Sequence, residues 1–533
     1  MKKIFISTAL VILCGMLPAS GSDNHPPAKK YQVDICIYGA TSAGVIAAYA
    51  AEKCGKSVLL IEPGQMIGGM TTGGLGQTDI GNKQAITGLA RRFYQDVGKQ
   101  YGAEEKWTFE PSVAETVMNG YLQEVHVKPL LGKQLVKVNK QGNKIISILL
   151  KDTGKAGSPD ISVSGKVFID CSYEGDLMAA AGVSYAVGRE SNSQYQETID
   201  GVQLMHGHQF PDGIDPYKIP GNPSSGLLWG ISSDSLLPAG SEDKRIQAYN
   251  LRICLTDSAA NMIPITQPQH YDPAKYELLL RLMAAQSGKR SLNDYFIWSI
   301  MPHRKTDINN KGAFSTDMIG MNYDWPEADW TEREKIFQAH LDYTKGLLYF
   351  IGHDPRVPDT LRKQMLRWGY PKDEYAAFGH FTPQLYVRES RRMTGEYEMT
   401  EHNCRGKVTV DDGIGLAAYT MDSHNCERIV VNGMVKNEGN VEVGGFHPYP
   451  ISYRSLVPRQ DECSNLIVPV CLSATHIAYG SIRMEPVFMV LGQSSAMAAA
   501  LAIDSQRAVQ GIDVKRLQQW LQEDPLLDHK HTF

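Results

Sequence analysis

A glycine-containing turn between two apolar runs constrains the fold of this chain more than any other segment. Residues 34–38 (DICIY) have the composition of a short buried strand, and residues 39–44 (GATSAG) follow as a tight turn. An alanine-rich helix is predicted over residues 45–54, with Gly55 at its end, and residues 58–61 form a second apolar strand. A strand, a turn, a helix and a second strand in this order are the parts of a βαβ unit in a parallel sheet.

The residues of this unit also suit the binding of a dinucleotide. Gly39 permits the sharp turn after the strand, and Gly44 lets the helix pack closely against it. The N-terminus of the helix then offers free N–H groups and a positive dipole end to a pyrophosphate. Glu62 follows Gly44 by 18 residues, where a carboxylate can accept hydrogen bonds from ribose hydroxyls. Thr41 replaces the middle glycine of the usual G-x-G-x-x-G pattern, so an ordinary turn of another α/β protein is the alternative.

A second glycine-rich stretch, residues 68–76 (GGMTTGGLG), comes soon after Glu62. Such a run lets the backbone approach a flat, phosphate-bearing ligand without interference from Cβ atoms. A flexible loop is the alternative, which the position after a βαβ unit disfavours. With this stretch the sequence resembles the FAD-dependent oxidoreductases of the glutathione-reductase-like and fumarate-reductase-like group. In that group a Gly-Gly pair beyond the ribose-binding acid runs along the FAD pyrophosphate toward the flavin ring.

The resemblance implies FAD as the cofactor and indicates which residues of this chain would hold it. One is Asp170, at the end of the apolar strand 161–169, because this strand end borders the adenine side of FAD in the family. Turn chemistry and helix capping are the alternative roles for Asp170. Another is Gly492, in a small-residue helix over residues 492–502 that closes over the ribityl chain and pyrimidine edge of the flavin in the family; a tightly packed core helix is compatible with that role. The full set of expected cofactor-binding residues is Gly39, Ala40, Thr41, Ser42, Ala43, Gly44, Glu62, Gly68, Gly69, Met70, Thr71, Thr72, Gly73, Gly74, Asp170 and Gly492.

The same resemblance implies an α/β fold with a discontinuous, three-layer Rossmann-like FAD-binding domain. Short strands over residues 135–138, 144–150 and 161–169 fit the small antiparallel meander of this group. From about residue 185 to residue 460 the βαβ pattern is absent, which indicates an inserted α+β substrate domain. The expected segments are a signal peptide (1–22), the first part of the FAD-binding domain (31–185), the substrate domain (186–461), the second part of the FAD-binding domain (462–512) and a C-terminal helix and tail (513–533).

Charge and cysteine spacing argue against several classes of protein. The 533 residues carry a net charge of −5, so a basic face for nucleic acid is not expected. No C-x-x-C pattern is present, which argues against a zinc site and a dithiol redox motif, and no metal is expected. No second G-x-G-x-x-G follows Glu62, so no NAD(P)H domain is expected. In an oxidising compartment the disulfides to consider are Cys404–Cys426 and Cys463–Cys471.

The N-terminus has the pattern of a Sec-type signal peptide. Lys2 and Lys3 precede a mostly apolar stretch over residues 4–17, and residues 19–21 are small enough for cleavage. The stretch is too short for a stable membrane span, and no other apolar run is expected to form one. Cys14 follows a leucine rather than a small residue, which disfavours a lipoprotein. We therefore expect export to the periplasm or the extracellular space.

Three polar clusters extend the resemblance into the middle of the chain. They comprise residues 301–310, residues 385–392, and residues 422–425 together with 445–454. They match motifs of a secreted or periplasmic branch of the family, some of whose members are labelled xanthan lyase. An arginine fork suits a substrate carboxylate, but a salt-bridge network with nearby glutamates is an equal alternative. The residues expected to bind substrate are Arg388, Arg391, Arg392, Tyr449, Tyr453, Arg454 and Arg483.

A histidine is the expected catalytic base. Hydride transfer from an alcohol carbon requires removal of the hydroxyl proton, and the ordinary pKa of histidine lies nearest the operating pH. His447 and His424 rank first because they lie in a polar, aromatic segment. His476, in the flavin-closing segment, ranks next, and His303 ranks last. For each histidine a purely structural role is the alternative.

These features predict an exported FAD-dependent oxidoreductase that transfers hydride to flavin N5 from a small polar substrate, such as a sugar or a uronate. A polysaccharide lyase is one alternative, although a lyase needs no flavin. The other alternative is a flavin-dependent reductase fed by a separate electron-transfer partner, since the chain has no C-x-x-C-H haem motif. The electron acceptor and the oligomeric state are left open.

Overall fold

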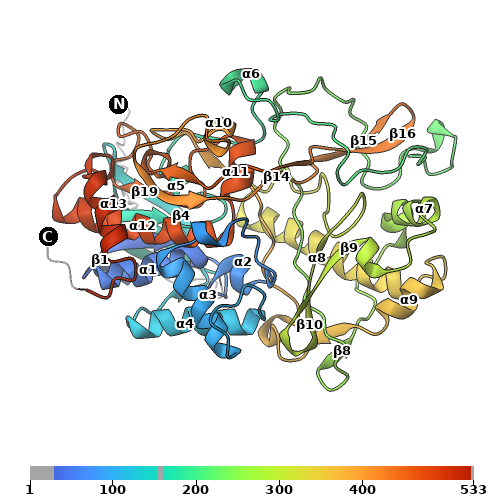
Figure 1. Cartoon of the computed structure of the whole chain (residues 1–533), viewed down its shortest axis with the longest axis horizontal. Helices are drawn as coiled ribbons and strands as arrows, with labels where there is room; N and C mark the ends of the chain where they lie inside the picture. Colours follow the sequence, from blue (N-terminus) through green and yellow to red (C-terminus); the bar gives the residue numbers. More distant parts are fainter. Residues whose placement is uncertain (1–28, 154–159, 530–533) are drawn as a thin grey trace, which may run out of the picture.

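The structure is a computed structural model that describes residues 29–153 and 160–529. The predicted signal peptide over residues 1–22 lies outside the described residues. Figure 1 shows two regions side by side: a sheet covered by helices on the left, and a looser group of helices and small hairpins on the right.

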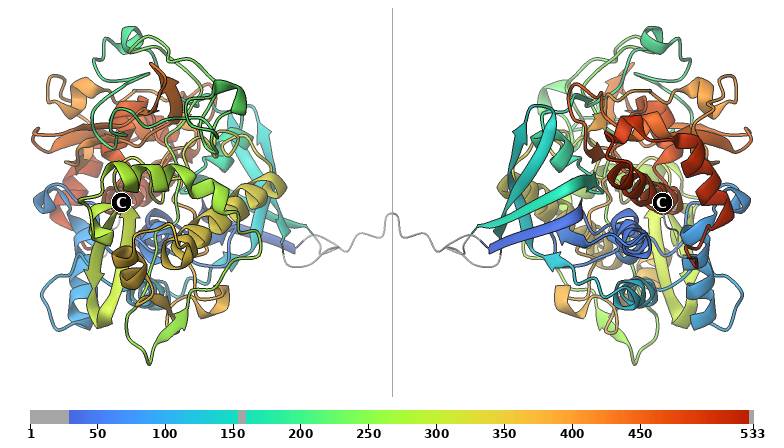
Figure 2. Two further views of the ribbon diagram at one scale, coloured as in Figure 1. Left: turned by 90° about the vertical axis from the view of Figure 1, so that its right-hand side faces the viewer. Right: turned by 90° about the vertical axis from the view of Figure 1, so that its left-hand side faces the viewer.

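One seven-stranded sheet organises the left-hand region. Its first strand, β1 (Lys29–Tyr38), pairs in parallel with β2 (Val58–Glu62) on one side and with β6 (Ile161–Asp170) on the other. The remaining strands are β3 (Leu130–Leu131), which follows β2; β5 (Lys144–Asp152) and β4 (Lys133–Gln141), which continue from β6 as an antiparallel meander; and β19 (Leu466–Ile467), which pairs in parallel with the end of β6. In Figure 2, β1 in blue and the blue-green strands β4 to β6 run together along one side of the molecule. The parallel strands around β1 confirm the predicted Rossmann-type α/β fold.

The βαβ unit differs from its prediction at two boundaries. Strand β1 begins at Lys29 rather than at residue 34, because it pairs with β6 along its whole length. Helix α1 (Ser42–Lys53) begins three residues earlier than predicted, because Thr41 is its N-cap. The turn between them is therefore shorter than the predicted one.

Helices pack against the sheet and against one another. Besides α1 they include α3 (Gly88–Gln100), α4 (Pro111–Glu124), α12 (Glu485–Asp504) and α13 (Val514–Glu523). Helix α12 lies against α1 and α3 and contacts β6. By length and composition α12 could cross a membrane, contrary to the prediction that no other apolar run is long enough, but 94% of its apolar window is buried in the fold. A helix that is apolar on all sides is expected where neighbours surround it, so α12 is a core helix.

The part of the chain between α5 (Asp176–Ala180) and β19 consists of helices and two-stranded sheets, of which α7 to α9 and β8 to β10 lie in the right-hand region of Figure 1 and α10 lies on the left. Its helices are α6 (Asn192–Tyr195), α7 (Glu277–Ala285), α8 (Trp330–His353), α9 (Asp359–Met365) and α10 (Glu401–Cys404). Its antiparallel strand pairs are β7 (Tyr185–Ala186) with β12 (Arg392–Met393), β8 (Met262–Pro264) with β11 (Gly369–Pro371), β9 (Phe296–Met301) with β10 (Lys305–Asn310), β13 (Gly413–Ala417) with β18 (Tyr449–Ser452), β14 (Met421–Ser423) with β17 (Val441–Val443), and β15 (Glu427–Val431) with β16 (Met434–Glu438). The exact domain borders at residues 185 and 461 stay predictions.

The cysteines of the described residues form no disulfide. All eight are free, and seven of them are buried. Cys404, Cys426, Cys463 and Cys471 therefore do not form either of the two expected pairs. Cys471 instead lies with its Sγ 3.2 Å from the carbonyl oxygen of Tyr173, which accepts its hydrogen bond. These thiols serve as small buried side chains.

Candidate functional site

The turn after β1 has no room for side chains at its two terminal glycines. Gly39 has a φ of +93°, and a Cβ atom there would lie 2.5 Å from the backbone nitrogen of Ser172. A Cβ atom on Gly44 would lie 1.9 Å from the carbonyl oxygen of Gly39. The end of β1 and the first turn of α1 are thus in direct backbone contact, as a dinucleotide-binding turn requires.

Thr41 fits the middle of this turn without a glycine conformation, since its φ is −62°. Its Oγ1 accepts a hydrogen bond from the N–H of Gly44 at 3.4 Å and donates one to the carbonyl oxygen of Cys171 at 2.8 Å. The departure from G-x-G-x-x-G is therefore a threonine that caps α1 and ties the turn to the residue after β6. The first-turn N–H groups of α1 still have no partner within the helix.

Glu62 ends β2 and lies in a cavity beside this turn. Its Oε2 accepts a hydrogen bond from the N–H of Ala40 at 2.7 Å, and its Oε1 accepts one from the N–H of Gly64 at 2.7 Å. The cavity, which we call the nucleotide cavity, has a volume of about 120 Å³. Its lining includes Gly39, Thr41, Glu62, Gly64, Gly69, Tyr173, Glu174 and Trp330. Burial raises the pKa of Glu62 to about 7.

The second glycine-rich stretch lies directly beside the turn. Gly68 has a φ of +87°, and its N–H donates to the carbonyl oxygen of Ala40 at 2.6 Å. Helix α2 (Gly69–Thr72) follows, and a Cβ atom on Gly69 would lie 2.2 Å from Tyr173 Oη. Tyr173 Oη accepts a hydrogen bond from the N–H of Met70 at 2.8 Å. Two glycine-rich segments and the residues after β6 thus surround one end of the nucleotide cavity.

Glu485, the first residue of α12, holds these segments together. Its buried carboxylate accepts three hydroxyl hydrogen bonds, from Ser42 at 2.6 Å, from Thr71 at 2.7 Å and from Tyr173 at 2.6 Å. Burial raises the pKa of Glu485, and these hydroxyls act in the opposite direction. The C-terminal part of the chain is therefore joined to α1, α2 and the end of β6 through one side chain.

The glycine-rich stretch continues into the contact between the two regions. A Cβ atom on Gly73 would lie 2.4 Å from Cβ of Gln384, and one on Gly74 would lie 3.0 Å from the carbonyl oxygen of Arg252. Gly74 has a φ of +119°, which favours glycine there. Five residues further on, Asp79 lines a second cavity. The stretch thus runs from one cavity to the other.

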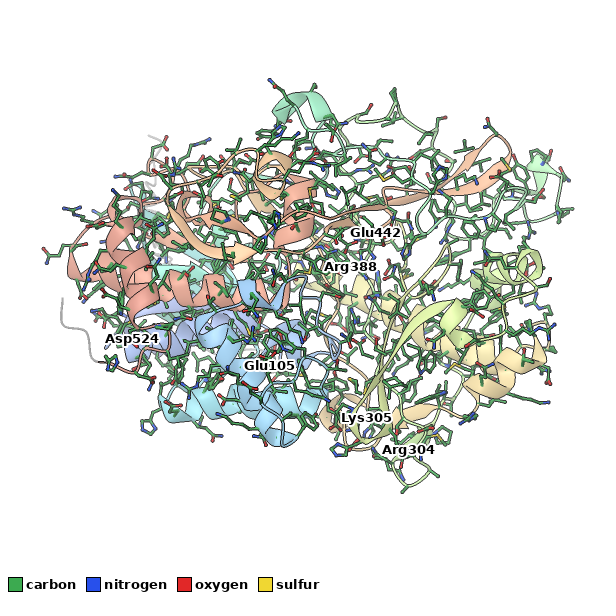
Figure 3. The ribbon with its side chains drawn as sticks, viewed as in Figure 1. Glu105, Arg304, Lys305, Arg388, Glu442 and Asp524 are labelled. Atoms are coloured by element: carbon green, nitrogen blue, oxygen red, sulfur yellow. The ribbon has the colours of Figure 1, made fainter. Side chains whose placement is uncertain are left out.

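The second cavity, which we call the polar cavity, has a volume of about 100 Å³. It is lined by Asp79, His208, Ile297, Asn309, Asn310, Tyr386, Tyr419, Asp422, His424, Asn440 and Glu442. These residues come from the segment just after the glycine-rich stretch, from β9, β10, β14 and β17, and from loops. Figure 3 places Glu442, with Arg388 near it, in the middle of the molecule between the two regions.

His424 is positioned in the polar cavity by two carboxylates. Its Nδ1 lies 2.7 Å from Asp317 Oδ2, and its Nε2 lies 3.5 Å from Asp422 Oδ2. Arg388 Nη2 lies 2.9 Å from the other oxygen of Asp317. Burial alone would raise the pKa of Asp317, but Arg388 and His424 outweigh it and hold the pKa below its usual range. A charged Asp317 favours a proton on Nδ1, and Nε2 faces the carboxylate of Asp422 in the cavity lining.

Asp422 and Tyr386 are held by a second buried arginine. Arg483 Nη2 lies 2.8 Å from Asp422 Oδ2, and its Nη1 donates to Tyr386 Oη at 3.2 Å. Burial would raise the pKa of Asp422, but His424 and Arg483 lower it below its usual range. The guanidinium carbon of Arg388 lies 4.7 Å from the ring centre of Tyr386, within cation–π distance. Arg388 and Arg483 thus hold the side chains of Tyr386 and Asp422 in the lining of the polar cavity.

A family model described as FAD dependent oxidoreductase matches residues 34–521. The chain belongs to the FAD-dependent oxidoreductase family. It is therefore an FAD-dependent oxidoreductase, as the sequence predicts, and FAD is its cofactor. The family description includes no lyase activity, so the xanthan lyase label is not confirmed. No curated protein matches the chain.

Solved flavoprotein structures match parts of the chain at low identity. A flavoprotein/dehydrogenase from Cytophaga hutchinsonii is 14% identical over 29% of this chain and 42% of that one, with a TM-score of 0.22. L-proline dehydrogenase from P. horikoshii is 18% identical over 31% of this chain and 26% of that one, with a TM-score of 0.19. THI4 from Thermovibrio ammonificans is 18% identical over 30% of this chain and 66% of that one, with a TM-score of 0.24. The chain covers less than half the length of the first two, so their substrates say nothing about this enzyme.

The residues around the nucleotide cavity of this FAD-dependent oxidoreductase fit the adenosine and pyrophosphate parts of FAD. Glu62 offers carboxylate oxygens to ribose hydroxyls, and the N-terminus of α1 offers N–H groups to phosphate oxygens. Gly39 and Gly69 keep side chains out of the same space. The predicted roles of the turn and of Glu62 are therefore compatible with the structure.

Several expected cofactor residues make structural contacts in this fold, and their contacts with FAD stay predictions. Asp170 accepts hydrogen bonds from the N–H and Oγ of Ser172 at 3.0 and 2.6 Å and from the N–H of Met178 at 2.8 Å. It therefore sets the turn before α5 (Asp176–Ala180), which is the alternative role considered for it. A Cβ atom on Gly492 would lie 2.4 Å from the carbonyl oxygen of Ala43, so this glycine allows α12 to pack on α1. Thr72 donates its hydroxyl hydrogen bond to Ile67 and does not face the nucleotide cavity.

Of the four candidate histidines, all of which the structure describes, His424 alone lines the polar cavity. His476 is buried at the start of α11 (His476–Ile482), with Nδ1 2.7 Å from Glu389 Oε2 and Nε2 3.0 Å from Ser423 Oγ, so both ring nitrogens are occupied. The side chain of His303 is 72% exposed on the turn between β9 and β10. His447 is also exposed, although it ranks first with His424 in the sequence.

The arginine cluster of residues 388–392 is mainly a salt-bridge network. Arg391 Nη1 lies 2.9 Å from Asp176 Oδ1, and Arg392 Nη1 lies 2.8 Å from Glu190 Oε1. Arg388 holds Asp317. None of these three arginines lines the polar cavity, and the partners outside the cluster come from distant parts of the chain.

The expected substrate residues near residue 450 lie away from both cavities. Tyr449 is buried and donates to Ser481 Oγ at 2.7 Å, and Tyr453 is buried and donates to the carbonyl oxygen of Val509 at 2.7 Å. The side chain of Arg454 is 48% exposed, and its Nε lies 2.9 Å from Asp412 Oδ2. Packing and surface pairing therefore explain these residues.

Sequence reasoning missed several residues of the polar cavity. His208, with a φ of +49°, has its Nε2 3.1 Å from Glu442 Oε1. Asp79 and Tyr419 face each other across 3.5 Å between Tyr419 Oη and Asp79 Oδ1. No local pattern marks these positions. Asn309 lies in a polar cluster that the sequence did single out, and that signal could have identified it.

Binding of FAD by this enzyme is expected to strengthen as the pH rises through 7. The ribose hydroxyls favour the ionised form of Glu62, whose pKa without FAD is about 7, so below that pH binding must first remove a proton. Between pH 6 and pH 8 the dissociation constant of the apoprotein should fall about tenfold. Titration of the apoprotein with FAD at each pH, followed by flavin fluorescence, measures this dissociation constant.

The matched variants for this titration are Glu62→Gln and Glu174→Gln. Glu174 lines the same cavity, and burial raises its pKa to about 7 as well. The pH dependence should vanish in Glu62→Gln and persist in Glu174→Gln. A pH dependence that persists in Glu62→Gln would remove Glu62 from the ribose site.

Proposed function

We propose that the enzyme oxidises a hydroxyl-bearing carbon of a small polar substrate in the polar cavity, with His424 as the base. The observation that supports this most directly is the setting of His424. Asp317 faces one ring nitrogen, and the other lies beside Asp422 in the cavity lining. A general base must lie within hydrogen-bond reach of the proton it removes and must be in the correct tautomer.

In this proposal, each group near His424 has a defined part. The substrate hydroxyl donates a hydrogen bond to His424 Nε2, and the proton passes to that nitrogen as the C–H bond on the same carbon breaks with its electron pair. The product is a carbonyl compound. Bound FAD supplies the acceptor of the hydride. Asp317 stabilises the imidazolium that forms, and Arg388 keeps Asp317 charged.

The position of the polar cavity supports the proposal. The glycine-rich stretch lines the nucleotide cavity with Gly69, and Asp79, three residues after the end of the stretch, lines the polar cavity. In this proposal FAD lies along the glycine-rich stretch. Its adenosine end occupies the nucleotide cavity, and its flavin end points toward the polar cavity. Export by the Sec route and a carbohydrate substrate are further parts of the proposal, and they rest on the sequence alone.

Anaerobic addition of the right substrate to the FAD-loaded enzyme is expected to bleach the visible absorbance of oxidised flavin. A panel of monosaccharides and polyols, each added to separate samples, tests the proposal, with the matching deoxy compound as the control for each active one. The deoxy compound that lacks the reacting hydroxyl should cause no bleaching. If dithionite bleaches the flavin but no panel member does, while reduced enzyme is reoxidised by unsaturated acceptors, the enzyme is a reductase and this proposal is wrong.

A further inference from the structure

We infer that the polar cavity selects a neutral polyhydroxy substrate, such as a neutral sugar, over a uronate, and that Asp79 enforces this choice. The inference rests on the proposed function and specifies its substrate class. It follows from how charges are paired around the cavity.

Three carboxylates line the polar cavity, those of Asp79, Asp422 and Glu442. Within the described residues, no lysine or arginine belongs to this lining. Asp422 is paired with Arg483 at 2.8 Å, and Glu442 is paired with His208 at 3.1 Å. No cation therefore stands ready for the carboxylate of a uronate.

Arg252 is a nearby cation with an unused donor, and among the described residues Arg388 and Arg483 likewise have side-chain nitrogens without a hydrogen-bond partner. The side chain of Arg252 is 2% exposed, and its Nε and Nη2 donate to the carboxylate of Asp307. Among the described residues its Nη1 has no hydrogen-bond partner. The nearest carboxylate oxygen on the cavity side is Asp79 Oδ2, 3.9 Å from Nη1. Asp79 thus stands between this guanidinium and the cavity and screens its charge.

A uronate in this cavity would bring a fourth carboxylate against the three that line it. Like charges placed together in a binding site are unfavourable and serve to exclude wrong ligands. The effect here is moderated by solvent, since the side chains of Glu442 and Asp79 are 51% and 28% exposed. An ammonium group gains little either, because Arg252, Arg483 and His208 already face the lining carboxylates.

The hydroxyls of a neutral sugar match this lining well. They can donate hydrogen bonds to the carboxylates of Asp79 and Asp422. They can also accept hydrogen bonds from Asn309, Asn310 and Asn440, which line the same cavity. Hydrogen bonds that involve a charged acceptor are stronger than neutral ones, so the acids favour hydroxyl donors.

The test compares sugars that differ only at C6, which carries a hydroxymethyl group in the neutral sugar and a carboxylate in the uronate. Glucose with glucuronate, and galactose with galacturonate, are added to the FAD-loaded enzyme under anaerobic conditions, and the rate of flavin reduction is followed. Calorimetry of the oxidised holoenzyme with the same four compounds measures binding without reaction. The neutral member of the active pair is expected to exceed its uronate at least about tenfold in both measurements.

The Asp79→Asn variant tests whether Asp79 screens the charge of Arg252 from the polar cavity. This change exposes the charge of Arg252 to the cavity and should lower the preference for the neutral sugar about tenfold. Asp359→Asn, on the exposed surface of α9, is the matched control and should leave the ratio unchanged. Retention of the flavin spectrum shows that Asp79→Asn is folded. If it loses flavin, the comparison of neutral sugar and uronate in the parent enzyme still decides the substrate class.

The failures of the two proposals are distinguishable. Faster reduction or tighter binding with the uronate overturns this inference and leaves the proposed oxidation intact. An unchanged ratio in a folded Asp79→Asn variant overturns the role of Asp79. Absence of reduction by every member of the wider panel overturns the proposed function, and the inference falls with it.

Discussion

Replacement of His424 by alanine in the FAD-loaded enzyme is expected to slow reduction of the flavin by substrate about a hundredfold or more. The imidazole has Asp317 2.7 Å from Nδ1, and its Nε2 lies on the side of the polar cavity. Without the imidazole the hydroxyl loses its proposed proton acceptor as the C–H bond breaks. Stopped-flow measurement of flavin absorbance gives the rate, and the flavin spectrum should stay that of the parent enzyme.

The control for this experiment is His447→Ala, because His447 is exposed and lies outside both cavities. It should reduce flavin at the parent rate. Asp317→Asn should give a smaller loss than His424→Ala, since it removes the group that orients the ring and keeps the ring itself. A His424→Ala variant that reduces flavin at nearly the parent rate would rule out histidine as the base and direct attention to Tyr386 or Asp422.

Replacement of Gly44 by valine is expected to abolish FAD binding. Even one added carbon at this position would lie 1.9 Å from the carbonyl oxygen of Gly39, so the end of β1 and the start of α1 must separate. The helix N-terminus then no longer faces a pyrophosphate bound at the turn. The ratio of flavin to protein in the purified variant measures the effect, and circular dichroism shows whether the chain is folded.

Gly120→Val is the matched control for the helix. Gly120 lies in α4, and a Cβ atom there would meet nothing within 4 Å. The same substitution should therefore keep full flavin content, and it carries no cost in helix propensity, because valine is a better helix former than glycine. Gly44→Ala, a smaller change, should show partial or complete loss of flavin in a chain that folds more easily. Full flavin content in either Gly44 variant would mean that residues 39–44 are not the pyrophosphate turn.

The nucleotide-binding half could be predicted from the sequence because its signals are local. Residues 34–62 contain a whole βαβ unit, so the glycines, the helix and Glu62 are set by short-range geometry. The boundaries shifted because β1 is extended by its pairing with β6, a strand more than a hundred residues away. The capping role of Thr41 likewise depends on a partner, Cys171, that sequence spacing does not reveal.

The polar cavity could be predicted only in part, because it is assembled from distant segments. His424 and Asp422 belong to one polar cluster, but Asp79, His208 and Tyr386 come from other parts of the chain and meet through tertiary packing. The arginine cluster shows the same limit. A guanidinium fork suits a substrate carboxylate and a protein carboxylate equally, so only the positions of the distant partners decide between them.

The carboxylate of Glu485 has a consequence for the order in which the protein matures. It bonds to Ser42, 443 residues away along the chain, and to Thr71, 414 residues away. The βαβ unit can form early from local contacts, but the network that fastens its turn is complete only when α12 has docked. Long-range contacts of this kind form slowly, and N-terminal segments emerge first during synthesis. We therefore expect the cofactor to be loaded late, after α12 has been synthesised and has docked, and a chain truncated before α12 should accumulate as apoprotein.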